Sequence, residues 1–221
     1  MTDLLYRWPA AATVGTRIPK EKFYEHGTVS AAVREKFVSE VQRITWAYKL
    51  AEATINLRGD DAVPEIQVFQ LDCKGDDVAG SVLTAIDKAI PLPIIFEVTR
   101  RTTSGDQVRM VAAHKLLGAG APKPSGYYST GWMPSDAERR PLPTVITLPG
   151  LLAVLLEPLT NLVVRPGEQV SDVADRLRAV GKLEREIAEL ERKLRTEPQL
   201  NRKIELRRTL KSKQHELEEQ R

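Results

Sequence analysis

The chain of 221 residues is 42% apolar and 29% charged, which is typical of a soluble globular domain of about 150–180 residues with an extension. Cys73 is the single cysteine, so an internal disulfide is excluded and a reducing, cytoplasmic location is expected. We expect no signal peptide, because no charged region leads into an apolar core at the N-terminus. The most apolar stretch, residues 148–164, contains Glu157 and Pro158 and is too polar for a membrane span.

The first predicted elements are helical. After a short apolar segment at residues 3–8, residues 17–24 have the pattern of a helix start, with Pro19 preset for the first turn. A long helix is predicted from Ser30 to Ala53, with Ser30 as its cap. Its apolar residues recur every three or four positions, which is the spacing of one buried helical face: Val33, Phe37, Val41, Ile44, Tyr48 and Ala51.

A strand, a short helix and a second strand follow. Residues 65–71 alternate between polar and apolar side chains as a strand does, and residues 81–90 form a short amphipathic helix. Pro91 ends that helix, and residues 94–98 form the second strand. This order predicts a βαβ unit whose two strands are parallel.

The rest of the globular part is predicted as strands, a connection and a helix. Residues 107–117 should return antiparallel after a hairpin turn, and residues 127–132 should form a last edge strand. Residues 133–143 contain three prolines and several charges and are interpreted as an exposed connection, and residues 151–162 as a core helix. We therefore predict an α+β domain at residues 1–167, in which a small mixed sheet packs on the long helix.

Residues 168–221 form a charged helical arm. From Lys182 to Arg221 there are 12 Lys or Arg and 9 Asp or Glu, so these last forty residues carry the whole formal charge of +3. Pro198 interrupts the helical spacing, which predicts either an antiparallel hairpin, and hence a coiled coil, or one kinked helix. Each half is short for an isolated helix, so we expect the arm to need a partner surface. Its candidate partner-binding residues are Leu183, Ile187, Leu190, Leu194, Leu206, Leu210 and Leu217.

Two groups of residues are candidates for contact with nucleic acid. Arg43, Trp46 and Lys49 follow one another at intervals of three on the predicted long helix, where two cations beside an aromatic ring could bind phosphate and stack on a base. The alternative is that Trp46 packs under a neighbouring element and the cations are solvated. The second group consists of basic residues of the arm, for which the solvated face of a coiled coil is the alternative: Arg202, Lys203, Arg207 and Arg208.

Four residues are weak candidates for catalysis. Glu65 and Gln67 lie on the first predicted strand and Glu97 on the second, so Glu65 and Glu97 could approach each other if the two strands are neighbours. Glu40, on the predicted long helix, precedes them in the chain. The pattern is faintly similar to the metal-binding Glu-x-Lys of restriction-type nucleases, although the lysine is missing. The alternative is the polar side of a strand. The histidines, His26, His114 and His215, show no metal-ligand spacing, so we predict no metal site and no cofactor.

Short segments in a fixed order along the chain carry a resemblance to a known family. They are Leu5-Tyr-Arg-Trp-Pro9, Ile18-Pro-Lys20, Ile44-Thr-Trp-Ala-Tyr-Lys-Leu50, Glu65-Ile-Gln-Val-Phe69, Ile86-Asp-Lys-Ala-Ile-Pro91, Ile95-Phe96 and Glu197-Pro-Gln-Leu-Asn-Arg-Lys-Ile-Glu-Leu206. Together they resemble the bacterial family catalogued as domain of unknown function 4391, over essentially the full chain. Its members look like accessory proteins encoded beside helicases and DNA methyltransferases in restriction-like or anti-phage loci. The resemblance implies no catalytic residues.

Three functions are therefore open. The leading expectation is a non-enzymatic accessory or assembly subunit of a DNA-targeting, anti-phage or restriction-like defence complex. Its arm would dock on a helicase or methyltransferase of the same locus, or form a homodimer. The second is a nucleic-acid-binding module that contacts DNA, and the third is a divergent metal-dependent nuclease built on Glu40, Glu65, Gln67 and Glu97. We expect no membrane contact.

Overall fold

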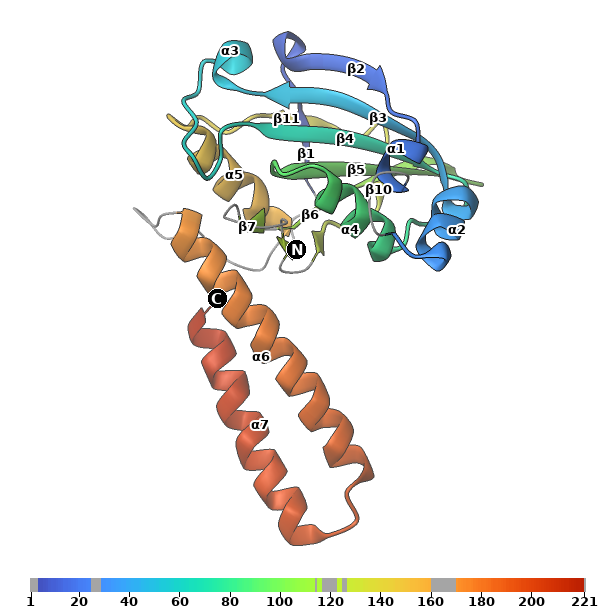
Figure 1. Ribbon diagram of the computed structural model, residues 1–221. Helices are drawn as coiled ribbons and strands as arrows, with labels where there is room; N and C mark the ends of the chain where they lie inside the picture. The colour runs from blue at the N-terminus through green and yellow to red at the C-terminus, as the bar shows by residue number, and fades with distance from the viewer. Residues whose placement is uncertain are drawn as a thin grey trace. The chain divides into compact units, whose positions relative to one another are not determined.

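The computed structural model of the protein describes residues 4–24, 29–113, 115–116, 123–124, 127–159 and 170–220. The chain divides into two units, residues 1–160 and 161–221, each of which is described by itself (Figure 1). The first unit has an α+β fold, which confirms the predicted class. Among the described residues, no helix is both long and apolar enough to cross a membrane.

The centre of the first unit is a mixed sheet. Its strand order is β10-β6-β5-β4-β3-β2, and β9 also pairs with β6. The strands are β2 (Thr13–Arg17), β3 (Val41–Leu50), β4 (Ile66–Cys73), β5 (Ile94–Thr102), β6 (Gly105–Ala112), β9 (Tyr128–Ser129) and β10 (Met133–Pro134). Only β4 and β5 run parallel within it, joined through α4 (Gly80–Ala89), and this is the predicted βαβ unit. Two small ladders, β1 (Leu5–Arg7) with β11 (Arg139–Pro141) and β7 (Lys115–Leu116) with β8 (Lys123–Pro124), complete the strands.

Helices cover both faces of the sheet (Figure 1). One face packs against α1 (Glu21–Tyr24), α2 (Ala31–Glu40) and α4, around the buried Phe37, Phe69, Ile86 and Phe96. The other face packs against α5 (Leu148–Leu156), its continuation η2 (Glu157–Leu159), the η1 turn (Ala10–Ala12) and β1. A short helix, α3 (Glu52–Ile55), follows β3. Since both faces are covered, β5 is a nearly continuous run of buried residues at its start.

The predicted long helix at residues 30–53 is wrong after Glu40. The helix α2 begins after Ser30, whose Oγ accepts from the Val33 amide at 3.4 Å, but it ends at Glu40, and the following ten residues are the strand β3. The side chains at positions 41, 44, 47 and 50 are buried, which is close to a helical spacing. Two bulges in the pairing of β3 with β4 produce this spacing, because each adds a residue and breaks the alternation of the strand.

The segment at residues 133–143 is largely exposed, as predicted, but it contains two short strands and is not only a connection. Its first part is β10, in which Met133 is buried, and its last part is β11, which pairs with β1 near the N-terminus. Pro134 and Pro141 stand in short edge ladders, where a missing amide donor is tolerated. The predicted edge strand at 127–132 is reduced to β9, and the predicted core helix begins earlier, where the Thr147 hydroxyl caps α5.

The second unit is a helical hairpin of α6 (Val170–Thr196) and α7 (Leu200–Gln220). Lys213 forms an ion pair with Glu186 at 3.4 Å, and Arg176 donates to the carbonyl of Gln220 at 3.0 Å, so the helices are antiparallel. Of the predicted leucine stripe, Leu183 and Leu217 are buried, and the remaining members are only half-buried: Ile187, Leu190, Leu194, Leu206 and Leu210. Two helices alone therefore cover five of these seven side chains only in part.

Candidate anion-binding site at the strand ends

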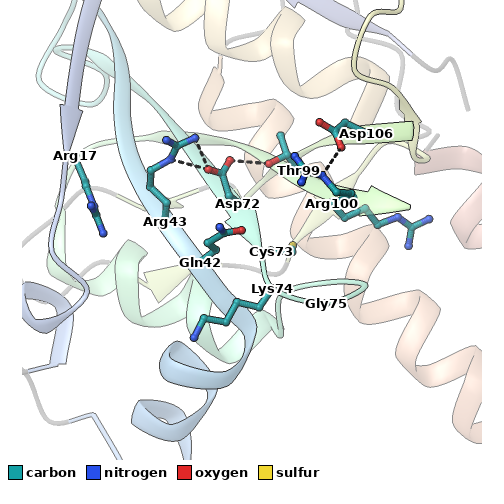
Figure 2. Close-up of a pocket in the computed structure, with 11 residues that line it drawn as sticks. Arg17, Gln42, Arg43, Asp72, Cys73, Lys74, Gly75, Thr99, Arg100 and Asp106 are labelled. Carbon is teal, nitrogen blue, oxygen red and sulfur yellow. Dashed lines mark hydrogen bonds and ion pairs between the residues drawn. The ribbon is translucent and has the colours of Figure 1, made fainter. Parts of the chain in front are cut away.

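An open pocket of about 550 Å³ lies at one edge of the sheet in the first unit (Figure 2). The strands β2, β4 and β5 end at this edge. The strands β3 and β6 begin there, because β3 is antiparallel to β2 and β4, and β6 is antiparallel to β5. The carboxyl ends of parallel strands are the usual place for ligands in α/β sheets. The pocket is lined mainly by polar and charged side chains, so it is suited to a charged ligand.

The pocket carries an excess of positive charge. Its lining includes five cationic side chains, Arg17, Arg43, Lys74, Arg100 and Arg101, and two carboxylates, Asp72 and Asp106. Arg43 pairs with Asp72 at 2.6 Å, and Arg101 pairs with Asp106 at 3.2 Å. Within the described part of the chain, Arg17, Lys74 and Arg100 have no carboxylate partner.

Arg100 is held in place by neutral groups. Its Nε and Nη2 atoms donate to Oε1 of Gln107 at 3.0 and 2.8 Å, and Nη1 donates to the carbonyl of Asp76 at 3.2 Å. The guanidinium lies 4.1 Å from the centroid of the Trp132 ring, within the range of a cation–π contact. These contacts fix the guanidinium without neutralising it, so its charge is available to the pocket.

Both carboxylate oxygens of Asp72 form hydrogen bonds with neighbouring side chains (Figure 2). Its Oδ2 atom accepts from both Nε and Nη2 of Arg43, at 2.7 and 2.6 Å, and its Oδ1 atom accepts from the Thr99 hydroxyl at 2.8 Å. The carboxylate therefore orients Arg43, and both of its oxygens are engaged.

Lys74 extends the positive field beyond the pocket wall. Its Nζ atom donates to the carbonyl of Val38 at 2.6 Å, which fixes the ammonium without a counter-charge. Burial lowers the pKa of the nearby Lys20, and the charges of Lys74 and Arg17 lower that pKa further. Burial is the larger cause, and the smaller contribution of Lys74 and Arg17 is the repulsion expected between neighbouring cations.

Cys73 also lines the pocket, but its chemistry is not that of a nucleophile. Burial raises the pKa of the thiol to about 12, and the charge of Asp77 acts in the same direction. A thiol with such a pKa is protonated at neutral pH and unreactive. The pocket can therefore bind and orient an anion through fixed cations, and its thiol does not supply covalent catalysis.

The three predicted nucleic-acid residues of the long helix do not form one face. Arg43 lies in the pocket, but Trp46 packs against the core cluster on the α1 and α4 face of the sheet. Lys49 is paired with Glu65 at 2.6 Å. The expected single face is wrong because the segment is a bulged strand: Arg43 pairs with Asp72 and lies on the opposite side from Trp46, and only Lys49 is brought to the side of Trp46.

The four candidate catalytic residues are not brought together. Gln67 and Gln70 are three positions apart on β4, so they project to opposite faces of the sheet. Glu65 accepts from Gln67 at 2.7 Å, whereas Glu97 accepts from Gln70 at 3.2 Å. The expected approach of Glu65 and Glu97 is therefore wrong.

Glu40 has a separate role, since its Oε2 atom accepts from the Ala79 amide at 2.7 Å, just before α4. No group of three metal-ligating side chains occurs among the residues that the structure describes. His26 and His114 lie outside those residues, and His215 is exposed and 3.6 Å from Glu219.

Glu97 is a buried carboxylate with structural partners. Its side chain is 1% exposed, and it accepts from Trp8 Nε1 at 2.8 Å and from Arg139 Nη1 at 2.6 Å. Trp8 follows β1 and Arg139 begins β11, so this carboxylate joins the β1–β11 ladder to the sheet. The interpretation of Glu97 as part of a polar strand side missed these long-range partners.

The predicted cations of the arm lie on α7. Arg202, Arg207 and Arg208 are exposed and Lys203 is half-buried, and none of them forms an ion pair within the described residues. They are available for an anionic partner, but the two helices do not form a closed site around them.

Sequence reasoning named only Arg43 of the strand-end cations. Arg17, Lys74 and Arg100 were missed, although each lies at the end of a strand or directly after it. Cations at the carboxyl ends of adjacent strands were the available signal, because such ends meet at one edge of a sheet. The order of the strands, which decides which ends meet, was not available from the residues themselves.

Residues 7–217 match a protein family that is described as a domain of unknown function, DUF4391. No curated protein matches the chain, and no solved structure matches it.

Proposed function

Because the chain belongs to the DUF4391 family, which is described as a domain of unknown function, we propose a role on the basis of the strand-end site. We propose that the protein is a non-enzymatic accessory subunit of a cytoplasmic, bacterial DNA-targeting defence complex. In this role the first unit holds the phosphodiester backbone of a nucleic acid, and the helical hairpin docks on a helicase-type partner or a methyltransferase. The observation that carries the proposal is the set of three fixed or exposed cations without carboxylate partners: Arg17, Lys74 and Arg100.

The spacing of the cations favours a chain of phosphates over one isolated anion. Arg17 lies on β2, Arg43 on β3 and Arg100 on β5, so the cationic side chains extend across three strand spacings. At about 4.8 Å per spacing this is roughly 14 Å. A nucleic acid strand carries one phosphate for about each 3.4 Å of helix axis, so several consecutive phosphates would face this edge.

The absence of aromatic side chains from the pocket lining indicates which part of the ligand is bound. A site that recognises bases in single strands presents aromatic rings on which they stack. The lining here consists of cations, two carboxylates and small polar residues, so the sugar-phosphate backbone is the favoured contact and base sequence is not read.

The helical hairpin supports the assembly part of the proposal. Five of the seven residues in its leucine stripe are half-buried, and Ile204 is 41% exposed. An additional helix packed on this stripe would remove apolar surface from water, which is the main driving force for helix association. The hairpin of a second copy of this chain could cover the same stripe. A homodimer is therefore one outcome of the assembly test described below.

The binding test compares the protein with the double variant Arg17→Ala, Lys74→Ala. Both side chains are exposed, so the double variant should fold normally. Affinity for a single-stranded oligonucleotide is measured by anisotropy at several salt concentrations. With three phosphate contacts, wild-type affinity should fall roughly twentyfold between 50 and 200 mM salt, and the double variant should lose about two thirds of that slope.

The matched control is Arg58→Ala. Arg58 is 86% exposed and lies in the connection between β3 and β4, at the opposite ends of these strands from the pocket. The control should bind as the wild type does. Equal losses in the control and the double variant, or no binding at low salt, would refute the proposed nucleic-acid contact.

The assembly test is co-purification with the helicase and the methyltransferase encoded in the same locus. Leu190→Asp with Leu210→Asp places charges in the stripe and should abolish association, while the binding of oligonucleotide by the first unit is retained. The absolute mass in solution separates a heterologous complex from a homodimer. Unchanged association of this variant would contradict the role of the hairpin.

A further inference from the structure

A second cavity lies on the sheet face that α1 and α4 cover. Its volume is about 350 Å³, and it opens between α1 and the C-terminal end of α4, above β3 and β4. Most of its wall is apolar and includes three aromatic rings: Ile18, Phe23, Trp46, Phe69, Ile90 and Leu92. Its size and apolar character are those of a cavity for a small molecule, at the lower end of the usual range.

Two residues that line this cavity each have a buried polar atom without a hydrogen-bond partner. These atoms are the indole Nε1 of Trp46, which is a donor, and the amide Oε1 of Gln67, which is an acceptor. Both atoms are buried, so solvent does not supply the missing partners, and neither finds one within the described part of the chain. Buried polar atoms are nearly always paired, so two such atoms at one cavity require an explanation.

The orientation of the Gln67 amide is determined by its neighbours. Its Nε2 atom donates to Oε1 of Glu65 at 2.7 Å, and Oε2 of Glu65 pairs with Lys49 at 2.6 Å. Since a carboxylate can only accept, the amide nitrogen must face Glu65 and the amide oxygen must remain unpaired. The side chain of Gln67 is held in this arrangement with only 3% of its surface exposed.

The unpaired donor and acceptor lie close to each other on the sheet. Trp46 is in register with Phe69, and Gln67 is two residues before Phe69 on the same face of β4. Trp46 and Gln67 are therefore diagonal neighbours, at about 7–8 Å between their backbones. A single flat molecule that enters between them can meet both.

We propose that this cavity binds a small planar heterocycle of the size of a nucleobase, whose edge presents an acceptor to Trp46 and a donor to Gln67. Phe23 and Phe69 provide apolar and aromatic contact for the ring. This site is separate from the cationic pocket at the strand ends and does not depend on the function proposed for that pocket.

The test follows the three tryptophan indole signals in a ¹H–¹⁵N NMR spectrum of the full-length protein. The signal that disappears in Trp46→Phe is that of Trp46. Adenosine and uridine are the probes, and ribose 5-phosphate is the control because it has no base. Titration with a nucleoside should move the Trp46 signal in a saturable way, while the signal of Trp8, already bonded to Glu97 at 2.8 Å, stays in place.

Trp46→Phe keeps an aromatic wall but removes the donor. Affinity for the nucleoside, measured by saturation-transfer NMR on the ligand, should fall about three- to tenfold, as expected for the loss of one hydrogen bond. Because Nε1 has no partner in the free protein, this variant should unfold at the same temperature as the wild type or higher. A lower unfolding temperature with unchanged affinity would show that Trp46 only fills space, and would overturn the proposal.

A parallel titration with a single-stranded oligonucleotide shows whether the bound heterocycle is a free small molecule or a base within a nucleic acid strand. A Trp46 shift with free nucleosides assigns the cavity to a free small molecule, and a shift with the oligonucleotide alone assigns it to a base presented by a strand. Both results support the site. No shift with any probe at millimolar concentration, or an equal shift with ribose 5-phosphate, would refute it, and the wild-type titration decides this even if the variant does not fold.

Discussion

Removal of the Arg139 side chain is the most direct perturbation of what holds the first unit together. Arg139 lies in β11 and forms an ion pair with Glu97, which is 1% exposed at the centre of the sheet. In Arg139→Ala the carboxylate stays buried and, among the described residues, keeps two neutral donors, Trp8 and Gln70. We expect a large loss of stability, because a buried charge without its counter-charge is strongly unfavourable.

The size of the loss follows from the burial of the pair. Breaking a fully buried ion pair costs about 3–5 kcal/mol. The Arg139 side chain is 26% exposed, so water can enter the space that it leaves and recover part of this energy. We therefore expect a decrease of about 2–4 kcal/mol in the free energy of unfolding, which corresponds to roughly 5–15 °C in the midpoint for a unit of this size.

Urea unfolding followed by far-UV circular dichroism and tryptophan fluorescence measures this loss. Arg58→Ala is the control, because Arg58 and Glu52 are 3.8 Å apart with side chains 86% and 63% exposed, and this change should cost less than about 0.5 kcal/mol. The double variant Arg139→Met, Glu97→Gln removes both charges and should regain most of the stability. A loss below about 1 kcal/mol in Arg139→Ala would refute the view that Glu97 depends on this partner for its stability in the core.

Two further predictions concern Cys73 and Gly59. Burial raises the pKa of Cys73 to about 12, so its alkylation by iodoacetamide at pH 8 should be roughly a thousandfold slower than that of an accessible thiol, and rapid labelling of the folded protein would contradict this. The unfolded chain loses this proton at a lower pH, so stability should decline as the pH rises above about 9. A Cβ at Gly59 would stand 2.6 Å from the Pro64 carbonyl oxygen, so Gly59→Ala should cost about 1–3 kcal/mol in thermal unfolding, while Gly80→Ala, with open space around the added methyl, should cost nothing.

The elements that were predicted correctly are those with local patterns. The strand β4 alternates between polar and apolar residues except at Val68 and Phe69, the helix α4 is amphipathic, and the prolines after Ala89 mark the end of the helix. The parallel pairing of β4 with β5 follows from this order, since a connection through a helix returns the chain in the same direction. The antiparallel return of β6 follows in the same way from its short turn.

The parts that could not be predicted depend on contacts between distant residues. The pairing of β1 with β11 joins segments about 130 residues apart, and it is this pairing that places Arg139 beside Glu97. The charge and proline content of residues 133–143 indicated only exposure. For the strand-end pocket, the cations could be read from the chain, but their convergence depends on the strand order, which local patterns do not contain.

The bulges of β3 explain both the wrong helix and the positions of the two proposed sites. In a regular strand, Ile44, Trp46, Tyr48 and Leu50 would share one face. The bulge between Trp46 and Tyr48 divides them, so that Ile44 and Trp46 pack in one core cluster and Tyr48 and Leu50 pack in the other.

The same shift brings Lys49 to the side of Trp46, where it pairs with Glu65 and so fixes the amide of Gln67. At the other end of β3, a second bulge lies between Val41 and Arg43. The guanidinium of Arg43, directly after this bulge, is held by Asp72 in the cationic pocket. One strand thus contributes to two sites of different chemistry, and the spacing that its bulges impose is the spacing that imitates a helix.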